Sequence, residues 1–181
     1  GCYVLLHIDE NTVNLEKNMN TKGKVIIFKI PKDDMQNSYK YYGRFLTELI
    51  KIIALKRAKL PEESRVHTHL YIDEAHNFIT SAISTILKET RKFKLFLTFS
   101  NQVISDIKET SLKEILLTSN VKIMGNNSNE TLQAINKTLK EDIKDLHCLE
   151  KGEFYLKVGN NELIKINNTT RLLGYSAAIS N

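Results

Sequence analysis

Short apolar stretches alternate with longer amphipathic ones in this chain, and this alternation is the feature that most constrains its fold. Residues 24–30, 67–73 and 94–100 are rich in β-branched, aromatic and leucine side chains, and each has the length of a buried strand. Between them, residues 39–59 and 80–91 carry apolar side chains at helical spacing. Strands that alternate with helices in this way predict an α/β fold with a parallel sheet.

The C-terminal part of the chain predicts an antiparallel element. Residues 152–167, "GEFYLKVGNNELIKIN", alternate like two strands around a turn at Gly159-Asn160-Asn161, which is typical of a hairpin. The remaining expected elements are a strand at 121–124 and helices at 105–117, 129–139 and 141–147. The predicted sheet is therefore mostly parallel, with flanking helices and a C-terminal antiparallel hairpin.

Three segments are expected along the chain. Residues 1–23 form an N-terminal strand and an exposed connector, residues 24–170 form one α/β domain, and residues 171–181 form a tail. In the long helix, Ser38 is the expected N-cap. The expected apolar stripe of that helix is Phe45, Leu46, Leu49, Ile50 and Ile53.

Composition narrows the class of protein without defining it. The 181 residues carry a formal net charge of +5 and 41% hydrophobic residues, an ordinary globular balance that permits contact with nucleic acid or a membrane surface. Cys2 and Cys148 form no CxxC motif, and no apolar stretch is long enough to span a bilayer, so a cytoplasmic location is expected. The basic clusters at 55–59 and 88–94 can contact DNA phosphates, but neither has interleaved aromatic residues suited to base stacking, so sequence-specific recognition is not expected.

Polar residues follow two of the predicted strands. Asp73 and Glu74 end the strand at 67–73, and Ser100, Asn101 and Gln102 end the strand at 94–100. In an open parallel sheet, ligands bind beyond the carboxyl ends of the strands. An aspartate there can hold Mg²⁺ through a water, a neighbouring glutamate can activate the attacking water, and a glutamine can contact the γ-phosphate.

A phosphate-binding loop is absent from the sequence. Such a loop has the pattern G-x-x-x-x-G-K-[ST], follows a strand and opens a helix. The one Gly-Lys pair, Gly23-Lys24, is followed by Val25, has Asn18 in place of the first glycine, and precedes a predicted strand. The expectation is that the chain is either the C-terminal part of a longer ATPase, without its Walker A loop and inactive alone, or not an ATPase.

Several segments, taken in order, resemble the HerA/FtsK-like motor ATPases, most of all the conjugation and type IV secretion ATPases of the TraG and VirB type. The matching segments, which span about residues 22–170, are "GKVIIFKIPKDD", "LYIDEAHNF", "TRKFKLFLTFSNQ" and "LHCLEKGEFYLKVGNNELIKI". The resemblance implies a RecA-like P-loop NTPase sheet in a hexameric ring. It also implies ATP and Mg²⁺ as cofactors, and the coupling of ATP hydrolysis to translocation of DNA or protein.

The resemblance also implies roles for particular residues. Asp73 would be the Walker B carboxylate that binds Mg²⁺ through water, Glu74 the catalytic base, and Gln102 the sensor of the γ-phosphate. Arg91 would be an arginine that acts in trans at the subunit border, although a solvated helix end is an equal alternative. Two further arginines with a weaker claim to that role are Arg57 and Arg171.

Alternatives remain open at this point. One is a HerA-like DNA helicase or packaging motor, and another is a degenerate interaction domain that does not hydrolyse ATP. The letters Asp73-Glu74-Ala75-His76 also spell the DEAH box of RNA helicases, but "TFSNQ" stands where a Ser-Ala-Thr motif would be expected. The partners implied are further copies of the chain, DNA bound without sequence specificity, and other channel components of secretion or conjugation, with peripheral association at the inner face of the cell membrane.

Overall fold

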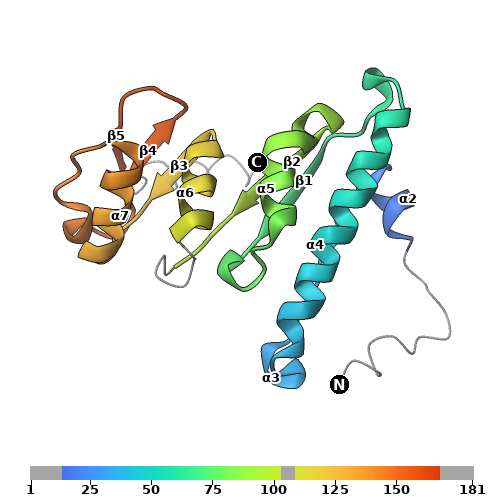
Figure 1. The fold of residues 1–181 in the computed structure, drawn as a ribbon, viewed down its shortest axis with the longest axis horizontal. Helices are drawn as coiled ribbons and strands as arrows, with labels where there is room; N and C mark the ends of the chain where they lie inside the picture. The colour runs from blue at the N-terminus through green and yellow to red at the C-terminus, as the bar shows by residue number, and fades with distance from the viewer. Residues whose placement is uncertain (1–13, 103–108, 168–181) are drawn as a thin grey trace, which may run out of the picture. The chain divides into compact units, whose positions relative to one another are not determined.

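The computed structural model describes residues 14–102 and 109–167, and the chain divides into two compact units, residues 1–102 and 103–181 (Figure 1). Each unit has its own small sheet. Unit 1 contains a two-stranded parallel sheet, and unit 2 contains a three-stranded antiparallel sheet. The predicted α/β class is confirmed, but the described strands form two sheets instead of one mostly parallel sheet.

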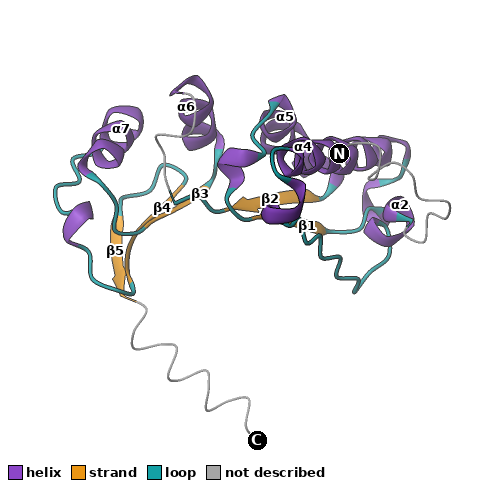
Figure 2. Ribbon diagram, turned by 90° about the horizontal axis from the view of Figure 1, so that it is seen from below, coloured by secondary structure: helices purple, strands orange, loops and turns teal. Residues whose placement is uncertain are grey.

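The sheet of unit 1 consists of β1 (Thr68–Ile72) and β2 (Leu95–Phe99), with α5 (Ser81–Glu89) in the connection between them. The long helix α4 (Ser38–Lys56) precedes β1, and α4 and α5 lie on the same side of the two strands (Figure 2). Their buried side chains pack against Leu95 and against the half-buried Leu70 and Leu97. The strand–helix–strand pattern at residues 67–100 is therefore confirmed.

The shorter helices of unit 1 complete it. They are α2 (Leu15–Met19), α3 (Lys32–Met35) and the 3-10 helices Arg57–Lys59, Glu62–Ser64, Ala75–Asn77 and Thr90–Phe93. The connector predicted at 10–23 thus includes a helix, which the Asn14 side chain caps by accepting a hydrogen bond from the Lys17 amide at 2.8 Å. Asn37, and not Ser38, is the N-cap of α4, and Phe45 is 57% exposed instead of buried.

The strand predicted at residues 24–30 is absent. The segment follows an extended path with an inward-facing Ile26 and with Val25 and Ile27 86% and 85% exposed. The alternation of side chains matches a strand, but among the described residues no strand pairs with the segment, and β1 and β2 pair with each other. A segment whose residues favour the extended conformation forms a sheet only where a neighbouring strand is available to pair with it.

Unit 2 consists of α6 (Glu109–Thr118), β3 (Val121–Met124), α7 (Asn129–Leu139), a 3-10 helix (Leu146–Cys148), β4 (Glu153–Val158) and β5 (Ile164–Asn167). The predicted hairpin is confirmed as the antiparallel pair β4–β5. At its turn, Gly159 has a φ of 55°, and its amide donates to the Asn120 carbonyl at 2.7 Å. The strand at 121–124 is also confirmed, but it pairs antiparallel with β4 and not within the parallel sheet.

The helix predicted at 141–147 is wrong. Lys140 adopts the left-handed conformation and ends α7. The Asn136 side chain then accepts a hydrogen bond from the Ile143 amide at 3.1 Å and donates to the Ile143 carbonyl at 2.8 Å. Because these backbone groups are bound by a side chain, they are not available to a helix.

Some sequence predictions fall on residues that the structure does not describe. These are the strand near residues 2–8, the start of the helix at 105–117, Cys2 and Arg171. Among the described residues, no helix is both long and apolar enough to cross a membrane.

Candidate functional site at the tips of the parallel strands

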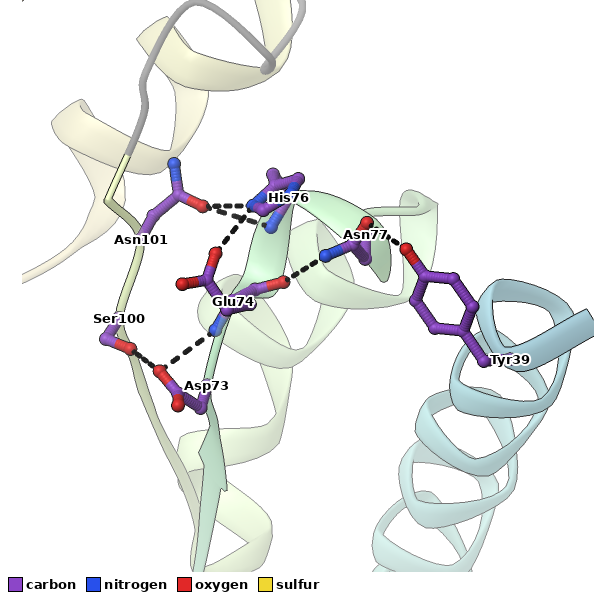
Figure 3. Close-up of polar contacts among 7 residues, drawn as sticks. All are labelled: Tyr39, Asp73, Glu74, His76, Asn77, Ser100 and Asn101. Atoms are coloured by element: carbon purple, nitrogen blue, oxygen red, sulfur yellow. Dashed lines mark hydrogen bonds and ion pairs between the residues drawn. The ribbon is translucent and has the colours of Figure 1, made fainter. Parts of the chain in front are cut away.

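The turn after β1 is bound to the tip of β2 by main-chain hydrogen bonds. The Ser100 amide donates to the Ile72 carbonyl at 3.0 Å, and the Ala75 amide donates to the Ser100 carbonyl at 3.0 Å. The ladder of the parallel sheet thus continues past the last strand residues. It places Asp73 and Glu74 beside Ser100 and Asn101, as expected for the carboxyl ends of neighbouring parallel strands (Figure 3).

Asp73 is exposed, and one of its carboxylate oxygens is held in place. Oδ1 accepts hydrogen bonds from the Ser100 hydroxyl and from the Glu74 amide, the latter at 3.1 Å. Oδ2 makes no hydrogen bond or ion pair with any residue in the described part of the chain. The carboxylate is therefore oriented through one oxygen and open through the other.

Glu74 has a left-handed backbone conformation, with φ 51° and ψ 50°. This conformation costs a residue with a side chain roughly 1–2 kcal/mol, so its surroundings must hold it. The Asn77 side chain does so, because its amide nitrogen donates to the Glu74 carbonyl at 3.2 Å. Asn77 is only 5% exposed, and its Oδ1 accepts a hydrogen bond from the Tyr39 hydroxyl of α4 at 2.8 Å (Figure 3).

His76 links the Glu74 side chain to the tip of β2. Its Nδ1 lies 2.7 Å from Asn101 Oδ1 and 3.3 Å from Glu74 Oε2. The His76 amide also donates to Asn101 Oδ1 at 3.3 Å, which identifies this atom as the oxygen of the Asn101 amide. Since both neighbours of Nδ1 are acceptors, Nδ1 carries the hydrogen, and the ring holds the Glu74 carboxylate and the Asn101 amide together.

Among the predicted site residues, the structure places Asp73 and Glu74 together at the tip of β1 and Arg91 in the helix that precedes β2. The predicted contact of Gln102 with the γ-phosphate stays a prediction, and its neighbour Asn101 accepts a hydrogen bond from His76. Gln102 is an exposed residue at the end of unit 1. Sequence reasoning placed Asn101 at the strand tip without a role, and only its contact with His76 reveals one.

Arg91 lies at the other end of the sheet. It belongs to the 3-10 helix Thr90–Phe93, which directly precedes β2, whereas Asp73 follows β1. The strands are parallel and five residues long, so the two residues are separated by about 16 Å of strand. Arg91 is exposed, and it lies at the end of the sheet opposite to the carboxylates of Asp73 and Glu74.

Arg57 is a structural residue, so the prediction that it projects toward a neighbouring subunit is wrong. It is 1% exposed. Its guanidinium donates five hydrogen bonds, which bind α4 to the start of the sheet and to the N-terminal segment. The acceptors are Asn20 Oδ1, Thr68 Oγ1 and the carbonyl oxygens of Met19, Val66 and Phe93. Burial lowers the pKa of Arg57, but a guanidinium keeps its proton in a protein.

The donor set at the strand tips fits Mg²⁺ of the kind that accompanies a nucleotide. The described residues contain no cluster of three or more metal-binding side chains, so no cage made of protein ligands alone is present among them. Mg²⁺ in phosphoryl-transfer sites is instead bound by one or two carboxylates, waters and the phosphates of the substrate. The open oxygen of Asp73 meets that requirement.

A phosphate-binding loop is not formed around Gly23-Lys24. Gly23 lies in a turn with a φ of 72°, and the extended segment 24–30 follows it instead of a helix. The backbone of this segment therefore agrees with its sequence, which does not match the P-loop pattern.

Comparison with solved structures shows that the fold is similar to that of a nucleoside triphosphatase. A similar structure is that of the genome packaging NTPase B204 from Sulfolobus turreted icosahedral virus 2. Its complex with AMPPCP matches with a TM-score of 0.53 and 19% identity, over 84% of this chain and 70% of that chain. Its complex with ATP-gammaS matches with a TM-score of 0.52 and 18% identity, over 84% and 71%.

No protein-family model and no curated protein matches the sequence. The likeness in fold supports the packaging-motor alternative of the sequence analysis better than the conjugation and secretion ATPases.

Proposed function

We propose that this chain supplies the Mg²⁺-binding and water-activating carboxylates of a motor ATPase of the genome-packaging kind. The observation that carries the proposal is the pair Asp73 and Glu74, held at the tip of a parallel strand and bound to the neighbouring tip at Ser100 and Asn101. The support from comparison is that the similar fold belongs to a packaging NTPase solved with ATP analogues.

Each residue of the site has a task that its contacts fit. Mg²⁺, when bound, supplies charge neutralisation for the phosphates. Asp73 holds it, directly or through a water, with the oxygen that Ser100 leaves open. Glu74 accepts the proton of the attacking water, and His76 and Asn101 keep its carboxylate pointed at the strand tips. Gln102, which follows β2 in the sequence, remains a proposed contact of the γ-phosphate.

The phosphate-binding loop has to come from polypeptide outside residues 1–181, because the sequence contains none. The proposed assembly is a hexameric ring that binds DNA without sequence specificity. In such a ring Arg91 acts on the nucleotide of a neighbouring subunit, since it lies far from the carboxylates of its own chain. A role in conjugation or type IV secretion is supported by the sequence resemblance alone. We therefore prefer genome packaging as the proposed function of the motor.

The test compares ATP hydrolysis by the product of the whole reading frame with that of residues 1–181. We expect Mg²⁺-dependent hydrolysis by the former and none by the latter. Asp73→Asn is expected to raise the Mg²⁺ concentration needed for half-maximal rate by at least about tenfold, because the cation loses its charged ligand. Asp33→Asn, at an exposed carboxylate of α3, is the matched control.

Turnover by residues 1–181 alone would contradict the need for a separate phosphate loop. An unchanged Mg²⁺ requirement in Asp73→Asn would remove Asp73 from the site.

A further inference from the structure

One face of the parallel sheet in unit 1 is exposed and carries ring-shaped side chains. α4 and α5 lie on the opposite face, against Leu70, Leu95 and Leu97 (Figure 2). Along β1, burial alternates, so that His69 and Tyr71 point away from the helices, and Tyr71 is 71% exposed. The exposed face consists of the outward-facing side chains of β1 and β2 and that of His67, which directly precedes β1. These side chains are His67, His69, Tyr71, Phe96 and Thr98.

Three of these rings form a continuous row. His69 lies directly opposite Phe96 in the strand register. Its ring stacks on Phe96 with centroids 5.2 Å apart and on Tyr71 with centroids 6.4 Å apart, both at an interplanar angle of 22°. His67 extends the row, 5.8 Å from Phe96. Rings that support one another in this way are held in place before any ligand arrives.

The composition of this face differs from that of a face meant for a second layer of helices. A parallel sheet that is covered on both sides has strands rich in valine, isoleucine and leucine throughout. Here leucine and isoleucine lie on the helix-covered face, whereas histidine, tyrosine and threonine lie on the other. Such side chains combine a flat apolar surface with hydrogen-bonding atoms, which suits a polar partner with rings of its own.

A basic hollow adjoins the row of rings. Phe96, which lies between His69 and His67 in the row, also lines an open hollow of about 630 Å³. The charged side chains around this hollow are Lys88, Arg91, Lys92 and Lys94, against Glu62 and Glu89. Lys94 pairs with Glu62 at 3.0 Å, and the cations still outnumber the carboxylates. The surface therefore offers stacking and positive charge side by side. The stacking rings come from β1 and β2, and the cations come from the cluster at 88–94, in which Phe93 is the one aromatic residue.

We propose that this ring-and-lysine surface, made of His69, Tyr71, Phe96, Lys92 and Lys94, binds single-stranded nucleic acid. Unpaired bases stack on the rings, and the phosphates lie against the basic hollow. A duplex does not fit the same surface, because its bases are stacked on one another and closed to the rings. Binding at this surface goes beyond the proposed ATPase activity, and it requires neither ATP nor Mg²⁺.

The experiment measures fluorescence anisotropy of labelled dT20 and rU20 with residues 1–181, at low salt and without ATP or Mg²⁺. Tyr71→Ala is expected to weaken binding about 5- to 150-fold, the range for loss of one stacked base. Tyr41→Ala is the matched control, because Tyr41 is 66% exposed on α4 and lies outside the row. Lys92→Gln is expected to lower the slope of log affinity against log salt by about one unit.

Three outcomes would overturn the proposal. The first is equal affinity of Tyr71→Ala and Tyr41→Ala for both oligonucleotides. The second is tighter binding of a duplex of the same length than of the single strands. The third is protection of Tyr71 from surface labelling in the product of the whole reading frame without nucleic acid, which would show that polypeptide covers this face. None of these results bears on ATP hydrolysis, so the two proposals fail separately.

Discussion

The buried side chain of Asn77 links the long helix α4 to the turn that carries Asp73 and Glu74, and its removal is the sharpest test of how this turn is held. Asn77→Ala deletes the hydrogen bond from Tyr39 at 2.8 Å and the hydrogen bond to the Glu74 carbonyl at 3.2 Å. A neutral hydrogen bond contributes about 1 kcal/mol, so the two together predict a loss of about 2 kcal/mol from the free energy of unfolding of unit 1. At the Glu74 carbonyl the turn loses one of two hydrogen bonds, because the Asn77 main-chain amide still donates to it at 3.2 Å.

The assay is urea unfolding combined with hydrogen exchange at the amides of β1 and β2, which reports unit 1 by itself. Asn37→Ala is the control, since Asn37 is exposed and makes no capping bond, and it should change stability by less than about 0.5 kcal/mol. Tyr39→Phe removes one of the two bonds and should cost about 1 kcal/mol. A loss below about 1 kcal/mol in Asn77→Ala, half the expected effect, would refute the reasoning. Strict additivity of Asn77→Ala and Tyr39→Phe would also refute it, because the two substitutions remove the same hydrogen bond.

Three further predictions concern the framework of the two units. Arg57→Leu should lower the free energy of unfolding of unit 1 by at least about 3 kcal/mol in urea titration, because five acceptors lose a charged donor. Gly43→Ala should cost about 1–3 kcal/mol in the same assay, because an added Cβ would collide with the Phe78 ring. The hydrogen bond from Tyr155 lowers the pKa of Asp145 from its usual 3.8, so its contribution is present above that pH and is lost as pH falls through the lower folded value. Tyr155→Phe should therefore reduce the acid sensitivity of unit 2, measured by NMR titration of Asp145 and by unfolding at neutral and low pH.

Each of these predictions has a result that would contradict it. Arg57→Leu of wild-type stability would mean that water replaces the guanidinium at no cost. A stabilised Gly43→Ala would mean that the Phe78 ring moves aside and that the helix preference of alanine prevails. If Tyr155→Phe left the pKa of Asp145 unchanged, other neighbours of Asp145 would be responsible for the lowered pKa.

The parts of the fold that depend on local pattern were predictable from the sequence. Residues 67–73 and 94–100 alternate or run apolar and are separated by one amphipathic segment, and they form β1, α5 and β2 within one or two residues of the expected ends. The hairpin at Gly159 has a turn chemistry that sequence alone identifies. The placement of Asp73 and Glu74 at the strand tip followed from the same pattern.

The parts that depend on distant partners were not predictable in this way. Residues 24–30 have the composition of a strand, but pairing requires a neighbouring strand, and the composition of the segment does not specify one. Arg57 carries the charge of an interface residue, and only the five acceptors around it reveal a buried anchor. Asn101 and His76 lie 25 positions apart in the sequence, so their contact is visible only in the structure.

The central claim is that Glu74 activates the attacking water in ATP hydrolysis. Its most direct test is the single-turnover rate of ATP hydrolysis by the product of the whole reading frame carrying Glu74→Gln, beside ATP affinity measured on the same protein. The account predicts a rate reduced about 10²- to 10⁴-fold with little change in affinity, because the base is lost and the binding groups remain. Glu63→Gln, at an exposed glutamate that precedes the sheet, should keep the full rate. A Glu74→Gln protein that hydrolyses ATP at the wild-type rate would contradict the account.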